Sequence, residues 1–223
     1  MTSNGPSFTV FLDANVLAKP VTRTLIMLAS RSSGYGVTWS GYVESEADRH
    51  LRSRQRPVSE VRELASQELS KPGEVAGRFA ATSMSDRQVL ADAEEAGASF
   101  IVTEDVDDFA DTDLETLSIA AVNPDLFLSS CTAEAGYREA LDFLAELSRN
   151  PRVTSEELHS RLGRVHPLTV HAHRAAFASS PTTATHNPPA EMYRGPRCLR
   201  CLRTDLETTR LGFCEKCATA GSA

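Results

Sequence analysis

Short apolar segments that favour β-strands alternate with segments of helical periodicity throughout the first 122 residues of the chain. Because two parallel strands need a long crossover connection, usually a helix, this alternation predicts a parallel sheet with helices on both faces. We therefore expect the chain to belong to the α/β class. The four expected strands are residues 8–12, 37–39, 99–103 and 117–122.

Helical patterns occupy the segments between these strands and most of the chain that follows them. Ser85 and Gly97 predict the two ends of one helix, since Ser favours N-caps and Gly favours the position after a helix. Pro20 predicts a kink in the first helix, and residues 154–157 (TSEE) have the pattern of a capping box. The expected helices are 15–31, 41–55, 57–70, 86–96, 124–130, 134–148, 154–162 and 167–178.

Composition divides the chain into four parts. The alternating pattern covers residues 1–132, and a helical extension follows at 133–178. Residues 179–190 are rich in Ser, Thr and Pro and contain almost nothing apolar, which is typical of a flexible or extended linker. The last part, 191–223, is arranged around four cysteines and is too small to hold a core of its own.

The N-terminal residues do not resemble a secretion signal, because they lack a basic start and Asp13 interrupts the only early apolar run. No apolar stretch approaches the roughly 18 to 20 residues that a transmembrane helix needs. The hydrophobic fraction of 41% and the charged fraction of 24% are ordinary for a globular protein. We therefore expect a cytoplasmic protein that does not enter a membrane.

Charge is unevenly distributed along the chain, whose net charge is −7. Residues 1–148 hold 12 Lys and Arg against 24 Asp and Glu, whereas residues 149–223 hold 11 against 6. An acidic body with a basic tail is expected where one part concentrates carboxylates and another part meets phosphates. On charge alone, solvated side chains explain the asymmetry equally well.

Four carboxylates stand at positions where the expected fold would bring them together. Asp13 and Asp105 follow the first and third strands, and sites in open α/β sheets form at the carboxyl ends of strands. Asp86 begins the helix that leads into the third strand, and Glu46 lies on the helix after the second. Their charges would repel unless a cation lay among them, and oxygen ligands suit Mg²⁺ or Mn²⁺. Taken singly, each acid is better explained as a helix cap, a favourable charge at a helix start or a solvated residue, so the interpretation rests on the whole set.

Several segments resemble the PIN domains of ribonucleases, especially those of VapC-type toxins. Residues 11–17 (FLDANVL) are similar to the opening strand and turn of that family, and residues 43–51 (VESEADRHL) to the helix that carries its glutamate. Residues 86–93 (DRQVLADA) and 97–105 (GASFIVTED) resemble its best-marked stretch, and Asp108-Phe109 matches a further Asp-Phe pair. The resemblance extends in order from residue 8 to about residue 130, and implies that residues 1–132 form a PIN-like nuclease domain.

The resemblance implies a metal-dependent endoribonuclease that leaves 3′-hydroxyl and 5′-phosphate ends. One or two Mg²⁺ or Mn²⁺ ions would activate water and neutralise charge on the phosphate. Glu44 is an alternative to Glu46, although Glu46 fits the spacing to Leu51 better. Asn15 would orient a ligand rather than bind metal strongly. The implied ligands are Asp13, Glu46, Asp86 and Asp105, alone or with Asp108, and the supporting residues are Asn15 and Thr103.

Two Cys-x-x-Cys pairs lie in the last part of the chain and are separated by 12 residues. Pairs at this distance are typical of one tetrahedral Zn²⁺ site, and disulfides are the poorer explanation in a chain without a secretion signal. Zinc would supply much of the folding energy of so small a segment. The predicted structural zinc ligands are Cys198, Cys201, Cys214 and Cys217, which leave Cys131 as an inert thiol.

Two groups of arginines favour contact with RNA phosphates over the alternative of a solvated surface. The first group, just after Glu46, is Arg49, Arg52, Arg54 and Arg56, and the second, around the first cysteine pair, is Arg194, Arg197, Arg200 and Arg203. The residues predicted to bind RNA are Arg49, Arg52, Arg197 and Arg200.

Three functions are compatible with these patterns. The leading hypothesis is the toxin of a type II toxin–antitoxin pair, which cleaves transfer or ribosomal RNA and is inhibited by a small antitoxin protein. The second is a ribosomal-RNA-processing PIN endonuclease of the Nob type, because residues 213–217 (FCEKC) are similar to the second knuckle of those enzymes. The third is a non-catalytic module that binds RNA or protein. By analogy with relatives, a homodimer is also expected.

Overall fold

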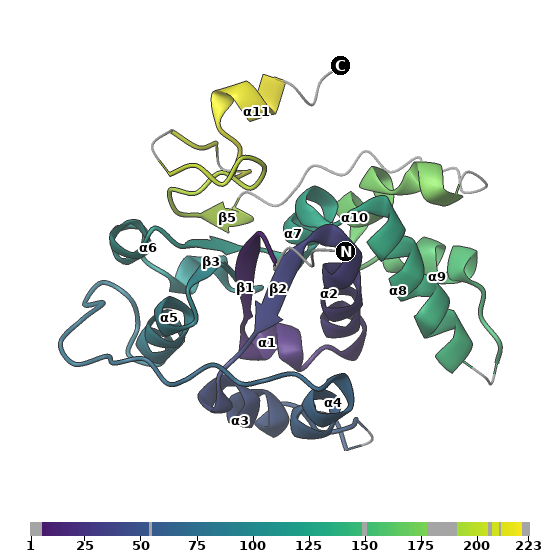
Figure 1. Ribbon diagram of the computed structural model, residues 1–223, viewed down its shortest axis with the longest axis horizontal. Helices are drawn as coiled ribbons and strands as arrows, with labels where there is room; N and C mark the ends of the chain where they lie inside the picture. The colour runs from purple at the N-terminus through teal and green to yellow at the C-terminus, as the bar shows by residue number, and fades with distance from the viewer. Residues whose placement is uncertain are drawn as a thin grey trace.

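The protein has a five-stranded, mostly parallel sheet in the order β2-β1-β3-β4-β5 (Figure 1). The computed structural model describes residues 6–53, 55–148, 151–177, 191–204, 207–209 and 211–219, so the linker expected at 179–190 lies outside the described residues. Strands β1 to β4 are parallel and β5 is antiparallel to β4. The α/β class is confirmed, whereas β5 was not predicted. The strands are β1 (Phe8–Leu12), β2 (Tyr35–Thr38), β3 (Ala98–Val102), β4 (Ala120–Val122) and β5 (Tyr193–Arg194).

Strand β3 is buried along its whole length, as expected for a central parallel strand with helices on both faces. Its register aligns Val102 with Leu12 of β1 and Val122 of β4. The carboxyl ends of the three strands therefore lie side by side. The next residues, Asp13 and Thr103, lie together at this edge of the sheet.

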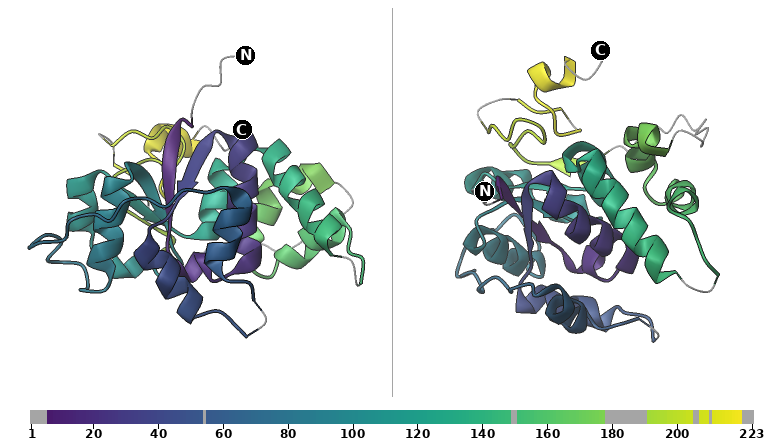
Figure 2. Two further views of the ribbon diagram at one scale, coloured as in Figure 1. Left: turned by 60° about the horizontal axis from the view of Figure 1, so that its bottom comes forward. Right: turned by 45° about the vertical axis from the view of Figure 1, so that its right-hand side comes forward.

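Helices cover both faces of the sheet, with α5 and α6 on one side and α2, α7 and α8 on the other (Figures 1 and 2). Helices α1, α3 and α4 lie beyond the carboxyl ends of the strands. Trp39, Phe11, Phe100 and Phe127 are among the largest fully buried side chains of the core. The bounds are α1 (Ala14–Leu17), α2 (Pro20–Ser33), α3 (Gly41–Arg49), α4 (Val58–Ala65), α5 (Asp86–Glu95), α6 (Asp111–Leu117), α7 (Pro124–Cys131) and α8 (Glu134–Leu147).

Three of the helices predicted within residues 1–132 differ from the observed ones. The helix predicted at 15–31 is two helices, because Pro20 starts a new helix at its first turn instead of kinking a continuous one. The helix predicted at 57–70 ends at Ala65, where Ser66 turns left-handed and the chain continues to pair Ser70 with the main chain of Trp39. The helix predicted at 41–55 ends at Arg49. Ser85 is the N-cap residue of α5, as predicted, but its hydroxyl donates to Asp86 and makes no hydrogen bond to a backbone N–H of the helix.

The helical extension packs against the sheet side that α2 covers (Figure 2). Helix α8 crosses α2 so closely that a Cβ on Gly136 would lie 2.7 Å from the carbonyl oxygen of Ala29. The capping box at Thr154 and Glu157 is confirmed at the start of α9 (Ser155–Leu162). The predicted last helix is instead α10 (Pro167–Ala172) followed by a short 3₁₀ turn, η2 (Arg174–Phe177), because His173 leaves the helical path and stacks on Tyr137.

Among the described residues, no helix combines the length and the apolar character that a membrane span would need.

Candidate functional site

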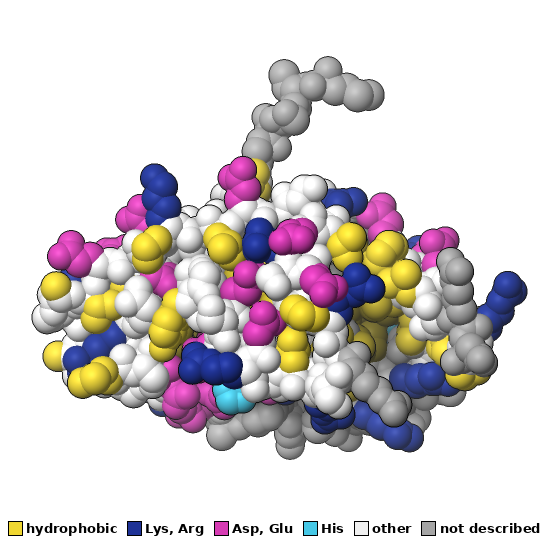
Figure 3. Space-filling view, turned by 90° about the horizontal axis from the view of Figure 1, so that it is seen from below, with side chains coloured by type: hydrophobic (Ala, Val, Ile, Leu, Met, Phe, Trp, Pro, Cys, Tyr) yellow, Lys and Arg dark blue, Asp and Glu magenta, His cyan; other side chains and the backbone are white. Residues whose placement is uncertain are grey.

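All five predicted acidic ligands line one open cleft at the carboxyl ends of the parallel strands. The cleft has a volume of about 910 Å³. Figure 3 shows the face on the side of α3 and α4, with acidic side chains through its middle and basic and apolar side chains among them. The carboxylates in the cleft are Asp13, Glu46, Asp86, Asp105 and Asp108.

The position of Asp13 follows from its place between β1 and α1. Its backbone is extended and its carboxylate caps α1 by accepting a hydrogen bond from the N–H of Ala14 at 2.7 Å. The other carboxylate oxygen accepts a hydrogen bond from the Thr103 hydroxyl, also at 2.7 Å. Asp13 is therefore both a helix cap and a member of the cleft, so the two roles considered for it are compatible.

Thr103 and Asn15 connect the residues at the ends of the two central strands. The Thr103 hydroxyl donates to Asp13 and accepts hydrogen bonds from the Asn15 amide at 3.0 Å and from the N–H of Asp105 at 3.1 Å. The same Asn15 amide donates to the Asp105 carboxylate at 3.0 Å, and the N–H of Glu104 donates back to the Asn15 oxygen at 3.2 Å. Asn15 and Thr103 thus orient both carboxylates, as the supporting role assigned to them requires.

Glu44 and Glu46 point to different environments although they lie two residues apart on α3. The Glu44 carboxylate is buried and accepts hydrogen bonds from the Trp39 indole at 3.0 Å and from Arg62 at 2.9 Å. Glu46 lines the cleft. Two residues correspond to about 200° of helical rotation, and this rotation separates a structural ion pair from a member of the acidic cluster.

Asp86 enters the cleft at the start of α5, where it accepts hydrogen bonds from the hydroxyls of Ser83 and Ser85. The preceding loop is held to the segment after β3, because Asp113 accepts a hydrogen bond from the N–H of Thr82 at 2.8 Å. Asp113 therefore holds the loop before α5 in place and with it the position of Asp86.

The electrostatics of the cleft disfavour several ionised carboxylates in the absence of a cation. The pKa of Asp13 is raised to about 6, chiefly by burial and to a smaller extent by the charges of Glu46 and Asp86, while hydrogen bonds from Thr103 and Ala14 oppose the rise. Burial likewise raises the pKa of Asp108, with smaller contributions from Asp86, Asp105 and Asp107. Asp86 interacts with both groups, so the five carboxylates form one electrostatic unit.

The rim of the cleft contains Arg52, which the sequence predicted to contact RNA, and further residues that the sequence did not identify. His50, Arg52 and Gln55 line it beyond α3, and Lys19 lines it beside its ion pair with Glu104. Val165 and His166 reach the cleft from the helical extension; Val165 is 62% exposed, and His166 is buried and paired with Thr22 at 2.9 Å. No local motif marks these two residues, because only the packing of the extension brings them here.

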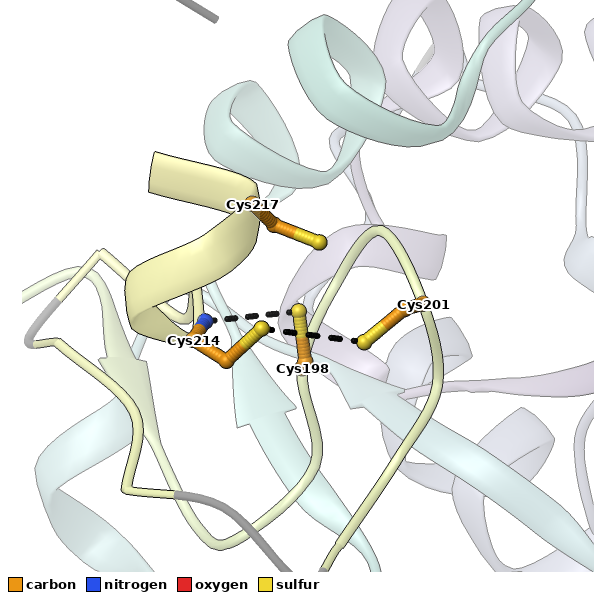
Figure 4. A group of neighbouring side chains, drawn as sticks. All are labelled: Cys198, Cys201, Cys214 and Cys217. Atoms are coloured by element: carbon orange, nitrogen blue, oxygen red, sulfur yellow. Dashed lines mark hydrogen bonds between the residues drawn. The ribbon is translucent and has the colours of Figure 1, made fainter. Parts of the chain in front are cut away.

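The four C-terminal cysteines converge on one point (Figure 4). Their sulfur atoms all lie within 4.8 Å of one another, and within the described parts of the chain no other group of His, Cys, Asp and Glu side chains is gathered in this way. The N–H of Cys214 donates to the sulfur of Cys198 at 3.4 Å. The cluster is compatible with the predicted zinc site. The segment that carries it, the cysteine knuckle, runs from the turn after β5 to the end of α11 (Glu215–Thr219).

The thiols of this cluster do not ionise independently. Burial opposes ionisation of Cys198, but backbone N–H donors, including those of Cys201 and Cys214, outweigh it and lower its pKa to about 6. Burial and the neighbouring sulfurs raise the pKa of Cys217 to about 12. Ionisation of one thiol therefore makes ionisation of its neighbours less favourable, and a bound cation would be needed to stabilise four thiolates together.

The arginines predicted to contact RNA occupy different environments. Arg52 lines the cleft, and Arg49 is exposed on α3. Arg200 is exposed on the knuckle, where it donates to the carbonyl of Cys217 at 3.3 Å. Arg197 is half-buried, and its guanidinium donates to the carbonyls of Ser118 and Leu202, both at 3.0 Å. Arg197 thus holds the knuckle to the α/β domain.

Comparison of the chain with known protein families, with curated proteins and with solved structures found no match.

Proposed function

We propose that the protein is a Mg²⁺- or Mn²⁺-dependent endoribonuclease with a PIN-like domain and a structural zinc knuckle. The observation that carries this proposal is the convergence of five carboxylates on one open cleft, from the residue after β1, from α3 and α5, and from the segment after β3. These are the acids that the resemblance to PIN domains picks out in the sequence, in the same order along the chain.

The residues of the cleft fit a hard divalent cation. The donor set consists of carboxylate oxygens, which Mg²⁺ and Mn²⁺ prefer, and it lacks thiols. Burial, with a smaller contribution from Glu46 and Asp86, raises the pKa of Asp13, and a bound cation would favour its ionised form. The Asn15 and Thr103 hydrogen bonds supply the outer support that metal-binding carboxylates commonly have.

In this proposal Asp13, Glu46, Asp86 and Asp105 hold the metal, with Asp108 at the edge of the set. The bound metal would lower the pKa of a water nucleophile and neutralise charge on the scissile phosphate. Asn15 and Thr103 keep Asp13 and Asp105 in place. An RNA phosphate approaching this acidic cleft needs cations on the rim, and Arg52 and Lys19 are the candidates there.

The openness of the cleft is compatible with a protein inhibitor that covers it, so we propose the toxin role and a small antitoxin as partner. Within this proposal the substrate is a folded cellular RNA, either a transfer or a ribosomal RNA. The Nob-type processing role uses the same chemistry, and mapping of the cleaved bonds distinguishes the two pathways.

Purified protein incubated with total RNA and Mg²⁺ or Mn²⁺ tests the proposal. Wild type should give discrete fragments that carry 5′-phosphates, whereas Asp13→Ala and an EDTA control should give none. Equal behaviour of wild type and Asp13→Ala would overturn the catalytic proposal. Retained RNA binding under that outcome would instead support the binding module.

A further inference from the structure

Arg194 on β5 forms ion pairs with Asp107 and Asp111, which lie in the segment that carries two of the cleft carboxylates. Its guanidinium donates to Asp107 through Nε at 3.0 Å and Nη2 at 2.8 Å, and to Asp111 through Nη1 at 3.4 Å. It also pairs with Glu191 at 2.8 Å. The Arg194 side chain is 25% exposed whereas Asp107 is 69% exposed, so the arginine is the anchored partner.

Asp107 lies within a short 3₁₀ turn, η1 (Val106–Asp108), between the cleft residues Asp105 and Asp108. Four aspartates lie close together in and around this turn, and their negative charges would repel one another: Asp105, Asp107, Asp108 and Asp111. Arg194 pairs with Asp107 and Asp111 and leaves Asp105 and Asp108 to the cleft. The guanidinium thus neutralises Asp107 and Asp111, whereas Asp105 and Asp108 remain available to a cation in the cleft.

Strand β5 is in turn held firmly by the cysteine knuckle. A Cβ on Gly212 of the knuckle would lie 2.6 Å from the Tyr193 ring, so the turn sits directly on β5. Gly195 has a φ of +114° and would bring a Cβ within 2.7 Å of the Ile119 carbonyl oxygen, so the chain after β5 lies against the strand β4 region. The N–H of Leu199 donates to the Gly212 carbonyl at 2.8 Å, which closes the knuckle around the cysteines.

We propose that Arg194 is a positioning residue, which transmits the order of the cysteine knuckle to η1 and thereby sets the placement of Asp105 and Asp108. This inference rests on the proposed function, because it assigns a consequence for divalent-cation binding in the cleft. The knuckle stands on the far side of the molecule from α3 and α4 (Figure 1), so its effect on the cleft is transmitted by Arg194 and not by direct contact.

The test compares full-length, zinc-loaded wild type with Arg194→Gln, Arg194→Lys and the control Arg78→Gln. The control removes a surface ion pair of the same type, Arg78 with Glu94, that does not involve η1. Two quantities are measured: amide hydrogen exchange of residues 104–109 without divalent cation, and the Mn²⁺ dissociation constant by titration calorimetry. Thermal unfolding of each variant checks that it is folded.

Arg194→Gln should speed exchange at 104–109 and weaken Mn²⁺ binding about tenfold, the lower end of the effect of outer-shell partners. Arg194→Lys should recover part of both, since an ammonium lacks the planar fork that spans two carboxylates. Arg78→Gln should resemble wild type. Unchanged exchange, or unchanged Mn²⁺ affinity, in Arg194→Gln overturns the inference. A wild type that binds no Mn²⁺ overturns the proposed function instead, and the exchange measurement then decides alone whether Arg194 orders η1.

Discussion

The cysteine knuckle and the acidic cleft are both sets of candidate metal ligands, but they are gathered to different degrees. The four sulfur atoms lie within 4.8 Å of one another, whereas in the described residues the cleft carboxylates form no group that compact. Neutral thiols can pack without a cation, while ionised carboxylates repel. In this structure the ligands that can stay neutral lie close together, whereas the ligands that ionise lie farther apart, and the proposed cation would offset their repulsion.

The largest expected effect tests the knuckle side of this comparison. Cys214→Ser should abolish zinc binding and unfold residues 191–219, since zinc binding in such segments contributes on the order of 10 kcal/mol. Metal analysis should find one zinc per wild-type chain and none in the variant. Limited proteolysis should then remove the tail and spare the segment up to residue 177. An equally resistant tail in the variant would show that zinc does not hold it.

The second prediction tests the cost of holding an ionised Asp13 in a buried position beside other carboxylates. An aspartate whose pKa is higher in the folded state binds its proton more tightly there, so its ionisation destabilises the fold progressively as the pH rises from about 4 to about 6. The pKa of Asp13 is raised to about 6. Metal-free Asp13→Asn should therefore be more stable than wild type at pH 7, by at most about 3 kcal/mol, and the difference should shrink toward pH 4.

The measurement is chemical denaturation of both proteins from pH 4 to pH 8, with and without Mg²⁺. Three buried histidines give stability the opposite dependence on pH, because burial lowers their pKa values and their protonation destabilises the fold below about pH 6.5: His159, His166 and His173. This effect is the same in both proteins, so it cancels when the variant is compared with wild type. Saturating Mg²⁺ should stabilise wild type and narrow the gap at pH 7. A variant less stable than wild type at pH 7 would contradict the account.

The third prediction separates two glutamates that are neighbours in sequence. Glu44→Gln breaks a mostly buried pair with Arg62 and should lower the free energy of unfolding by about 1–2 kcal/mol while RNA cleavage persists. Glu46→Gln should leave stability nearly unchanged or higher and should impair cleavage. Denaturation and cleavage assays on the two variants check this. Loss of cleavage in Glu44→Gln with full activity in Glu46→Gln would reverse the assignment.

The smallest expected effect concerns the rim. Arg52→Ala should weaken RNA binding by less than tenfold and lower the slope of affinity against salt concentration by about one. Arg31→Ala is the matched control, because this exposed arginine lies in the last turn of α2, away from the cleft. Filter binding at several salt concentrations measures both. Equal salt slopes for the two variants would remove Arg52 from the RNA contact.

The parts of the molecule that the sequence predicted are those encoded locally. Strands β1 and β3 and the capping box at Thr154 were found because periodicity and capping are patterns of neighbouring residues. The cleft acids were found because Asp13 and Asp105 stand at strand ends and the register brings those ends together. Which of Glu44 and Glu46 faces the cleft depends on how α3 is rotated about its axis, and only the structure shows this, through the hydrogen bond of Glu44 with Trp39.

The features that the sequence missed depend on contacts between distant segments. Strand β5 has only two residues, and its pairing with β4 arises from the docking of the knuckle. Arg197 was predicted to contact phosphates, yet its guanidinium is used by the carbonyls of Ser118 and Leu202. Val165 and His166 reach the cleft through the packing of the extension. The local sequence around a basic or apolar residue does not determine which distant residue its side chain will contact in the folded protein.

The pairing of β5 with β4 also bears on solubility. Strand β4 consists of Ala120, Ala121 and Val122, all buried, and β5 occupies the edge that this strand would otherwise present. An uncovered, uncharged edge strand is a template for pairing with another chain. A protein shortened before residue 191 would therefore tend to self-associate through β4, so the tail protects the sheet against aggregation whatever the knuckle binds.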